Sequence, residues 1–546
     1  MASPPLRVGF IVDAPGVSKY VAELLRWAQA QQFLAGSHLI IRDPASDDGT
    51  RPAGVSGRLA ELAWALLMRL EQRRLRGSRH ADHLCRHAVA DLPLPRIGAG
   101  ARAAPAGAAC TQDQAVLQAV REAGLDLLVH CGSGSLPEGW LDAAVLGVVS
   151  LEHGDPRSHR GGPSGFWEVC ERSPDTGFSV QQWTRDPQVR PILLRGSFAT
   201  QAHYLLNQAN VCESSLHYLK SVLSRIASTR VLQAQPGVPY CGRLATRPGL
   251  PQQLRYIGGL AASLLGSKLR SRLLGRQRRW GIAFQRRDWR DLVMASAHRV
   301  ANPAGRFYAD PFVVSRDGVD YCFVEDFDYR AQRGRISVLE LGDTQARFLG
   351  SVLDEPFHMS FPFLFEHAGT LFMMPETSEN RDIRIYRCVD FPLRWELHRV
   401  LMRDVSAVDT MMFRHDGKWW LLTNLAPQPH DDQGAELLIF HADDPFAPHW
   451  TPHPGNPIYI DPSRARNGGL LAADGQLHRV GQRQGFRQYG AGATIFRIDE
   501  ITPSRYRETA VASLEPDFGP GLLGTHHLHS NGRVTVFDYK TEEAIR

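Results

Sequence analysis

Apolar residues follow two different patterns in the two halves of the chain. In the first 200 residues, short apolar runs at residues 6–12, 125–129 and 145–151 alternate with stretches that carry apolar residues at helical spacing, such as residues 114–123. Strands that alternate with helices predict an α/β fold with a parallel sheet, whose ligands bind beyond the carboxyl ends of the strands. Two loops that follow strands, residues 132–135 and 152–162, would lie on that edge.

From residue 280 onward the pattern is all β. Hairpin markers recur, each before an alternating or aromatic run: Asp317-Gly318, Ala368-Gly369, Asp416-Gly417, Asp474-Gly475 and Asn531-Gly532. Their period of roughly 50 residues is the length of one propeller blade. Five such units predict a five-bladed β-propeller over residues 280–546.

The residues between these halves differ from both. We expect an α/β domain at 1–203, a helical and basic amphipathic connecting region at 204–279, and a Gly/Ala/Arg/Pro linker at 99–109 within the first domain. In residues 260–279, Leu260, Leu264, Leu269 and Leu273 share one face, and lysine and arginine crowd the rest. Such a helix predicts peripheral contact with an anionic membrane, and the alternative is a connecting helix packed on a domain with solvated arginines.

Composition narrows the class of protein. Apolar content of 43%, charged content of 22% and a net charge of +5 describe an ordinary globular protein and do not favour nucleic acid as a partner. The eight cysteines lie far apart without a CxxC pair, which predicts neither a zinc site nor a disulfide framework. There is no secretory signal and no apolar stretch of bilayer length, so we expect a cytoplasmic protein, with membrane contact limited to its periphery.

Residues 6–198 resemble the formyltransferase family. The matching segments are Asp126–Pro137 (DLLVHCGSGSLP), Gly147, Arg160-Gly161-Gly162-Pro163 and Thr176-Gly177-Phe178-Ser179. The resemblance implies a Rossmann-type parallel sheet, 10-formyltetrahydrofolate as cofactor, and formyl or related acyl transfer to the amine of an amino sugar.

The family's catalytic residues match only in part. Members use an Asn and a His at the tetrahedral intermediate and an Asp that orients the His. Here Ser150 stands at the Asn position, Glu152 occupies the His position, and His153 lies beside it. The resemblance thus implies His153 as base, Ser150 as oxyanion donor, Asp155 as the carboxylate partner of His153, and Glu152 and Arg160 as substrate-binding residues.

The second half resembles two groups of propellers. The segments FYADPF, HMSFPFLFEHAGTLFMMPETSENRDIRIYR and AVDTMMFRHDGKWWLLTN, within residues 280–540, resemble the N-terminal domain of glucosamine inositolphosphorylceramide transferases. Five-bladed glycoside hydrolases of arabinose and xylose polymers are also similar, and they use a carboxylate base, an acid and a third carboxylate that tunes the acid.

These resemblances imply roles for propeller residues. Asp310 matches the base, Asp409 matches the tuning carboxylate, and Glu376 is the candidate acid or ligand. The central residues expected to contact the sugar are Glu325, His358, Asn424, Arg464, Gln482 and His527. No metal site is predicted, because His526-His527 has no carboxylate partner in the sequence.

Three hypotheses follow from the two halves. The first is a carbohydrate-directed transferase of polysaccharide or glycolipid biosynthesis, with formyl or acyl transfer in the α/β domain and the glycan bound to the propeller. The second is a propeller glycosidase or transglycosylase that uses Asp310, Asp409 and Glu376. The third is a non-catalytic scaffold that binds glycan. All three expect a sugar or glycoconjugate as partner.

Overall fold

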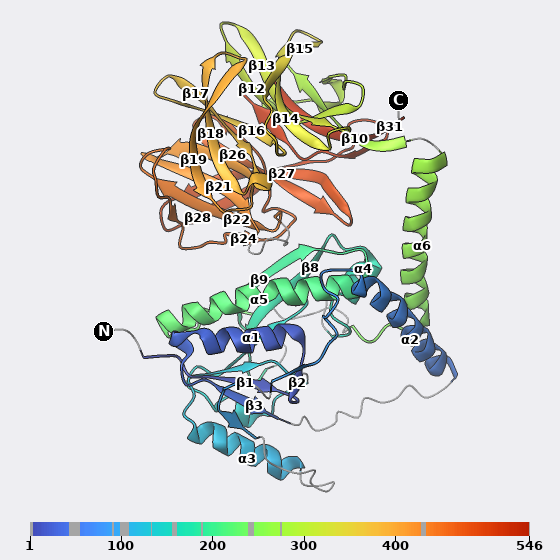
Figure 1. Cartoon of the computed structure of the whole chain (residues 1–546), viewed down its shortest axis with the longest axis vertical. Coiled ribbons are helices and arrows are strands. Elements are labelled where there is room, and N and C mark those ends of the chain that lie inside the picture. The colour runs from blue at the N-terminus through green and yellow to red at the C-terminus, as the bar shows by residue number, and fades with distance from the viewer. Residues whose placement is uncertain are drawn as a thin grey trace. The chain divides into compact units, whose positions relative to one another are not determined.

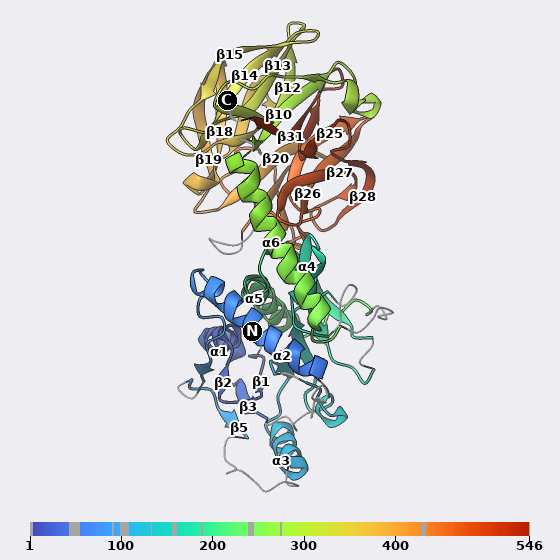
Figure 2. The same cartoon turned by 90° about the vertical axis from the view of Figure 1, so that its right-hand side faces the viewer.

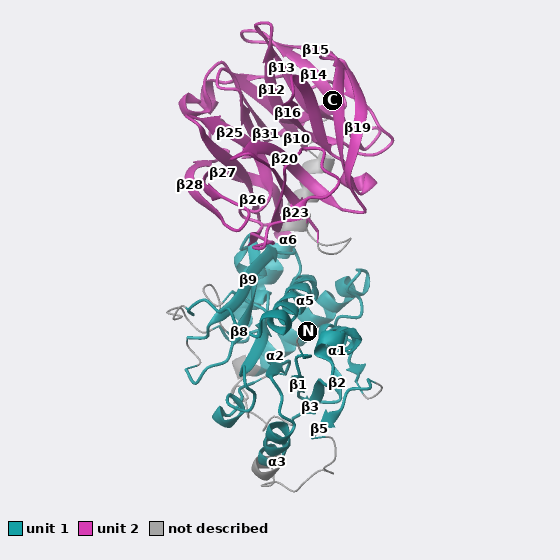
Figure 3. Ribbon diagram, turned by 90° about the vertical axis from the view of Figure 1, so that its left-hand side faces the viewer, with its two compact units in different colours: residues 1–260 teal, residues 261–546 magenta. Residues whose placement is uncertain are grey.

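The computed structural model describes residues 4–42, 55–89, 92–98, 109–132, 134–155, 161–186, 189–237, 245–273, 276–426 and 433–544. It separates into two compact units, residues 1–260 and 261–546 (Figure 3). We describe each unit by itself. The predicted linker at 99–109 lies outside the described residues except for its last residue. Arg160 also lies outside them.

Unit 1 is built on one mixed sheet. In the described residues its strand order is β5-β3-β1-β6-β7-β8-β9. Neighbours from β5 to β7 pair in parallel, as the alternating pattern predicts, whereas β7, β8 and β9 pair antiparallel. The bounds are β1 Val8–Val12, β2 Gly16–Val17, β3 His38–Ile41, β4 His87–Ala88, β5 Arg96–Ile97, β6 Leu127–His130, β7 Val148–Glu152, β8 Asp175–Gln182 and β9 Ile192–Ala199.

Helices cover both faces of this sheet. Their bounds are α1 Lys19–Ala30, α2 Val55–Arg76, α3 Ala109–Glu122, α4 Phe166–Glu171 and α5 Tyr204–Thr229, with short 3-10 turns at Gln32–Leu34 and Glu138–Trp140. One core joins α1 and α5 to Phe10, Val129 and Val149 of the strands (Figure 1). A second core, around Trp140 and Val120, lies on the other face.

Helix α5 lies beyond the predicted end of the first domain at residue 203, but it belongs to unit 1. It was expected in a connecting region, yet Leu216, Leu219 and Leu223 are buried in the same core as β1 and β6. The sequence pattern of a long helix after the last strand does not say which surface that helix covers.

Helix α6 spans Leu250–Leu273, and its first turns pack on unit 1 (Figure 2). Gln253 donates to the Ala60 carbonyl, and the Tyr256 hydroxyl donates to Glu71. The side chains of residues 263–276 lie outside the described part, and with them most of the predicted membrane-contact face. Among the described residues, no helix combines the length and apolarity needed to cross a bilayer.

Unit 2 is the predicted five-bladed β-propeller. Its described strands form five sheets of four or five strands. Four of these sheets each consist of strands that follow one another along the chain. The bounds are β12 Arg306–Arg316, β13 Val319–Asp328, β14 Arg333–Leu341 and β15 Ala346–Leu353; β16 Ser360–His367, β17 Thr370–Glu376, β18 Asp382–Asp390 and β19 Arg394–Arg403; β20 Ala407–His415, β21 Lys418–Leu425, β22 Glu436–Ala442, β23 Thr451–Pro452 and β24 Tyr459–Ile460; and β25 Asn467–Ala473, β26 Gln476–Gly485, β27 Gln488–Ile501 and β28 Tyr506–Leu514.

The fifth sheet closes the ring. It joins β10 (Arg276–Gln285) and β11 (His298–Arg299) to β29 (Leu522–Gly524), β30 (Leu528–Ser530) and β31 (Thr535–Ala544) from the other end of the unit. Strands β10 and β31 pair over ten residues, from Arg276 with Ala544 to Gln285 with Thr535. Closure removes the free sheet edges that an open array of blades would expose.

The predicted hairpin turns are confirmed. Asp317-Gly318, Ala368-Gly369, Asp416-Gly417 and Asp474-Gly475 each connect the first two strands of a blade, with positive φ at both residues. That conformation suits a two-residue turn whose twist matches the flanking strands. Asn531-Gly532 connects β30 to β31.

Candidate functional site

A β-bulge recurs at the same place in three inner strands. The ladder slips between Ala309 and Phe312 in β12, between Ser360 and Phe363 in β16, and between Val408 and Met411 in β20. The bulged residues Asp310, Phe361 and Asp409 share a left-handed backbone, with φ of 48°, 45° and 48°. Non-glycine residues rarely adopt this conformation, and bulges of this kind redirect a side chain next to a functional site.

In these three blades the second strand supplies a polar residue opposite the bulge. Glu325 pairs with Ala309, Glu376 with Ser360, and Asn424 with Val408. The predicted carboxylates therefore stand at two equivalent positions of successive blades. This repetition brings residues that are 50 to 100 positions apart in the sequence to one place in the structure.

Every blade contributes to the resulting polar cluster, which therefore lies where the five blades meet. Arg466, just before β25, donates from Nε to Asp409 Oδ2 at 2.5 Å, and its Nη2 lies 3.9 Å from Glu376 Oε2. Gln482 of β26 donates to the same Asp409 oxygen at 3.0 Å. Ser378 donates to Glu376 at 2.9 Å. One guanidinium thus joins carboxylates from two neighbouring blades.

The closing blade adds a histidine and a further carboxylate. His526 Nδ1 lies 2.5 Å from Asp538 Oδ2, and His526 Nε2 lies 3.7 Å from Asp310 Oδ1. The backbone N–H groups of His526 and His527 both donate to the other oxygen of Asp538, which fixes that carboxylate. Against the effect of burial, Asp538 raises the pKa of His526, and His526 holds the pKa of Asp538 below its ordinary value.

Burial dominates the protonation of the remaining carboxyl groups. It raises the pKa of Asp310 to about 7, which His526 opposes and Asp409 reinforces. It also raises the pKa of Asp409 to about 7, against the charge of Arg466. The pKa of Glu325 lies well above its ordinary value because of burial and the charges of Asp310 and Glu376. Burial and nearby charges thus favour the protonated form of Glu325, while Asp310 and Asp409 have pKa values close to neutrality. Acid–base chemistry uses carboxyl groups of both kinds.

One aromatic ring lies at the accessible side of the cluster. Tyr489 of β27 is 38% exposed, and Arg466 lies over its ring at 4.9 Å. The same ring makes an edge contact with His526, which is stacked on Trp280. A partly exposed ring beside charged groups is a suitable platform for the apolar face of a sugar.

Three of these residues could hold a metal ion. One ligand atom each of Asp310, His526 and Asp538 lies within 4.8 Å of the other two, and all three residues are buried. Asp310 Oδ1 also lacks a hydrogen-bond partner among the described residues, whereas His526 Nδ1 and Asp538 Oδ2 pair with each other at 2.5 Å. The sequence contains no carboxylate near His526-His527, and the fold supplies two.

The other residues predicted to contact the sugar lie at different distances from the cluster. His358 lies beside Glu325, with 3.7 Å between Nε2 and Oε1, and Gln482 belongs to the cluster. His527 is buried under the cluster, where its ring bonds the Pro311 carbonyl and contacts Phe312. It is therefore placed as a support of the Asp310 bulge rather than as a sugar contact.

Two predicted contacts have structural roles instead. Asn424 donates to the carbonyls of Glu436 and Ala465 and accepts the N–H of Asn467, so its amide joins two blades. Arg464 pairs with Glu508 at 3.0 Å and lies on the ring of Tyr459. Polar residues near propeller turns often bond backbone groups in this way.

Four cluster residues were not among the predicted site residues: Arg466, Tyr489, His526 and Asp538. Asp538 had a signal, because it is an acid inside the alternating strand TVFDY. Arg466 and Tyr489 had none, since nothing in their local sequence separates them from other arginines and tyrosines.

In unit 1 the predicted formyl-transfer residues lie in two groups. The Ser150 hydroxyl donates to Glu152 at 2.7 Å and accepts from the Trp183 indole at 2.8 Å. Glu152 also lies 3.6 Å from Arg190. Oxyanion binding by Ser150 would require these bonds to break.

His153 packs separately, edge-on against Tyr20. Burial lowers its pKa to about 4. Asp155 packs over β8, where a Cβ added at Gly177 would lie 2.6 Å from the Cβ of Asp155. The nearby acid Glu213 of α5 pairs with His80 at 3.0 Å and with Lys19 at 3.3 Å.

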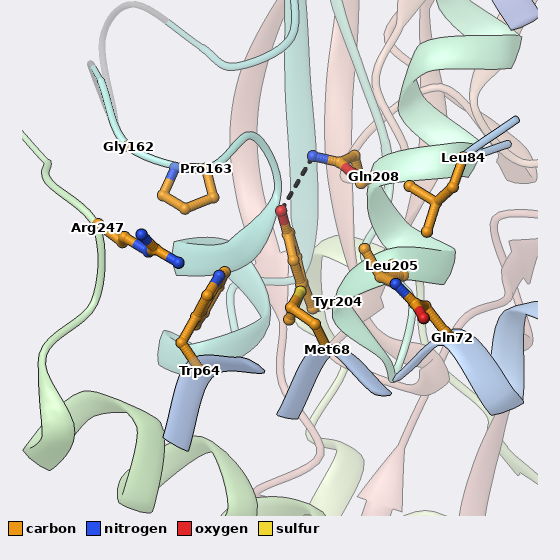
Figure 4. Close-up of a pocket in the computed structure, with 10 residues that line it drawn as sticks. All are labelled: Trp64, Met68, Gln72, Leu84, Gly162, Pro163, Tyr204, Leu205, Gln208 and Arg247. Carbon is orange, nitrogen blue, oxygen red and sulfur yellow. Dashed lines mark hydrogen bonds between the residues drawn. The ribbon is translucent and has the colours of Figure 1, made fainter. Parts of the chain in front are cut away.

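Unit 1 also contains an apolar cavity of about 460 Å³ (Figure 4). Helix α2 contributes Trp64 and Met68, and α5 contributes Tyr204, whose hydroxyl accepts a bond from Gln208. Arg247 lies over the Trp64 ring at 5.6 Å. Gly162 and Pro163, from the segment that resembles the formyltransferase loop, form part of its wall.

Comparison with known proteins gives matches for the propeller. Residues 291–517 match the family described as Glucosamine inositolphosphorylceramide transferase 1, N-terminal. The protein of that name from Oryza sativa subsp. japonica is 34% identical over 234 residues, which is 40% of this chain and 31% of that protein. The Arabidopsis thaliana protein is 35% identical over 210 residues, 38% of this chain and 27% of that protein. The chain spans about a third of the length of these relatives, which are named as transferases.

Solved structures that align with this chain include glycoside hydrolases. A family 117 glycoside hydrolase of Zobellia galactanivorans aligns with 49% of this chain and 92% of its own, at 11% identity and a TM-score of 0.32. The family 62 arabinofuranosidase domain of Coprinopsis cinerea aligns with 44% and 95%, at 12% identity and a TM-score of 0.35. The matched family segment includes Asp310, Glu376, Asp409, Arg466 and Tyr489, and it ends before His526.

Proposed function

We propose that the chain is a carbohydrate-directed transferase of glycolipid or polysaccharide assembly, and that its sugar substrate binds at the propeller centre. One observation carries this proposal: all five blades place a polar or charged residue in one cluster, in which several carboxyl groups have a raised pKa. Buried like charges cost stability, so a fold that brings several carboxyl groups together is typical of a functional site. The transferase names of the propeller's relatives support the choice of reaction class.

In this proposal Asp310 is the base and Glu325 the acid. Asp310 Oδ1 is buried within the cluster and has no hydrogen-bond partner among the described residues, so the fold leaves its lone pairs unused. Burial raises the pKa of Glu325, which favours its protonated form. The Glu325 proton passes to the leaving oxygen as the glycosidic bond breaks, and Asp310 takes the proton of the acceptor hydroxyl as the new bond forms. Arg466 holds Glu376 and Asp409, which would bind sugar hydroxyls and tune the acid.

The same arrangement with water as acceptor would hydrolyse a glycosidic bond. Glycosidase activity is therefore the alternative reaction of the same residues, and it needs no different geometry. Product analysis separates the two reactions, since transfer joins the sugar to an acceptor and hydrolysis releases it.

The test is to incubate the purified chain with nucleotide sugars and inositolphosphorylceramide, and separately with nitrophenyl glycosides, and to follow product by mass spectrometry. Asp310→Asn should lower the rate by roughly 10²- to 10⁴-fold, because it removes the base and keeps the shape. The matched control is Asp317→Asn, an aspartate in an exposed hairpin turn of the same blade. Sugar binding without turnover by the unsubstituted chain would instead support the scaffold hypothesis.

Formyl transfer by unit 1 stays a prediction, and its geometry gives it no added support. The Ser150 hydroxyl is already bonded on both sides, and burial of His153 lowers its pKa to about 4. A folate at ten times its dissociation constant would stabilise the chain by roughly 1.4 kcal/mol, so a thermal shift with folates tests this hypothesis directly.

A further inference from the structure

Helix α2 lies at the periphery of unit 1 with a fixed inner face (Figure 1). Trp64, Leu67 and Leu75 are buried on that face. Between them, the buried carboxylate of Glu71 accepts the Tyr256 hydroxyl at 2.7 Å and the Leu205 N–H at 3.1 Å. These contacts determine the rotation of the helix about its axis, and therefore which residues face outward.

The outward face is also apolar. Leu59, Leu62, Leu66 and Leu70 recur at positions i, i+3, i+7 and i+11, which form one row along the helix. Their exposed fractions are 52%, 69%, 59% and 47%. Single exposed leucines are common on protein surfaces, but a contiguous row of them marks an interaction surface.

Arginines border this leucine row. Arg73 continues it toward the end of the helix, Arg58, Arg69 and Arg76 lie along one flank, and Arg74 lies on the other. All five are exposed. The two acidic residues of the helix are Glu61 and the buried Glu71, so the outer surface is strongly basic.

We propose that the outer face of α2 docks unit 1 on the surface of an anionic lipid bilayer. An apolar row bordered by arginines matches a bilayer interface, where leucines enter the acyl boundary and arginines remain among acidic headgroups. The row spans Leu59 to Leu70, and the helix of 22 residues lies flat on the surface rather than crossing it. A second copy of the chain fits less well, because its arginines would meet those of the first.

This surface is separate from the membrane contact predicted for residues 260–279 and from the propeller cluster. It goes beyond the proposed function, since it concerns where the chain acts rather than which bond it changes. A chain held on a bilayer in this way would meet its lipid-linked substrates at the surface that contains them.

The experiment is co-sedimentation of the full chain with vesicles of phosphatidylcholine containing about 30% phosphatidylserine, against vesicles of phosphatidylcholine alone. The full chain should bind the anionic vesicles, and Leu62→Glu/Leu66→Glu should weaken binding by at least about tenfold. Arg69→Ala/Arg73→Ala should weaken it by about fivefold for each arginine and reduce its dependence on salt.

Two controls keep the test decisive. Leu393→Glu replaces a leucine that is 47% exposed in a propeller turn and should leave binding unchanged. The melting temperature of each variant should equal that of the unsubstituted chain, because the substituted side chains are exposed. Failure of the unsubstituted chain to bind anionic vesicles would overturn the proposal, as would equal binding by the leucine variant. A dimer in sedimentation velocity that Leu62→Glu/Leu66→Glu dissociates, without vesicle binding, would assign the face to a second copy instead.

Discussion

At the scale of single residues, the propeller cluster is a set of carboxyl groups whose protonation depends on burial. Glu325 is the clearest case, since burial and the charges of Asp310 and Glu376 all favour its neutral form. The unfolded chain exposes this carboxyl group to water, where its pKa is ordinary. Folding therefore favours uptake of a proton at Glu325, and stability depends on pH.

We predict that Glu325→Gln makes stability less sensitive to pH. The pKa of Glu325 is raised in the folded chain. At pH values below its unfolded pKa, the side chain is protonated in both states and does not affect stability. As the pH rises from there toward the folded pKa, its contribution to stability becomes increasingly unfavourable. The unsubstituted propeller should lose up to about 1.4 kcal/mol per pH unit in this window through Glu325, and the amide removes that loss. Melting temperatures from pH 5 to pH 8 measure the slope. Equal slopes in the two proteins would contradict the assigned protonation.

At the scale of elements, buried polar contacts stabilise a blade as well as apolar packing does. In the blade of β25 to β28, Arg479 lies fully buried and donates to both oxygens of Glu508, at 2.9 and 2.7 Å. Tyr506 donates to the same carboxylate at 2.7 Å. Although burial alone would raise it, Arg479 holds the pKa of Glu508 below its ordinary value.

We predict that Glu508→Gln destabilises the propeller by about 3–5 kcal/mol, because it leaves the buried Arg479 guanidinium without a counter-charge. Urea denaturation of unit 2 measures this change. The matched control is Glu515→Gln, which removes the more exposed pair with Arg483 and should cost less than about 1 kcal/mol. Similar costs for the two substitutions would show that burial does not govern these pairs.

At the scale of the whole molecule, each unit has its own apolar cores. Strands from the two ends of unit 2 share one blade and so close the ring. Strand β31 lies inside the closing blade, between β10 and the short strands β29 and β30. It also carries Asp538, which fixes His526 beside the central cluster. Closure of the ring and completion of the site therefore depend on the same strand.

We predict that ending the chain after Arg533 abolishes the cooperative unfolding of unit 2 and leaves that of unit 1 unchanged. Loss of β31 exposes the edge of β10 and removes the ten-residue pairing that holds the ring closed. Calorimetry should show one transition lost and one retained, and limited proteolysis should cleave within residues 276–533. A truncated chain that keeps both transitions would show that β31 is dispensable.

The sequence by itself determined the elements whose cause is local. Hairpin dipeptides and alternating strands specify blades one at a time, because turn geometry and side-chain alternation act over a few residues. Asp310 and Asp409 were recognised as candidates in another way, because the short motifs that contain them resemble those of known propellers. The strands around residues 125–129 and 145–151 were similarly predictable from their apolar runs.

Only the tertiary structure decided what those residues meet. Asn424 and Arg464 have the same local signals as the cluster residues. Yet Asn424 bonds backbone groups and Arg464 pairs with a separate carboxylate, because the packing of each blade determines which groups a side chain reaches. Asp538 enters the cluster through ring closure and Arg466 through the packing of neighbouring blades, and both join positions that no local pattern relates. A polar side chain makes a structural hydrogen bond or belongs to a site depending on its distance from residues far along the chain. The packing of the five blades fixes that distance.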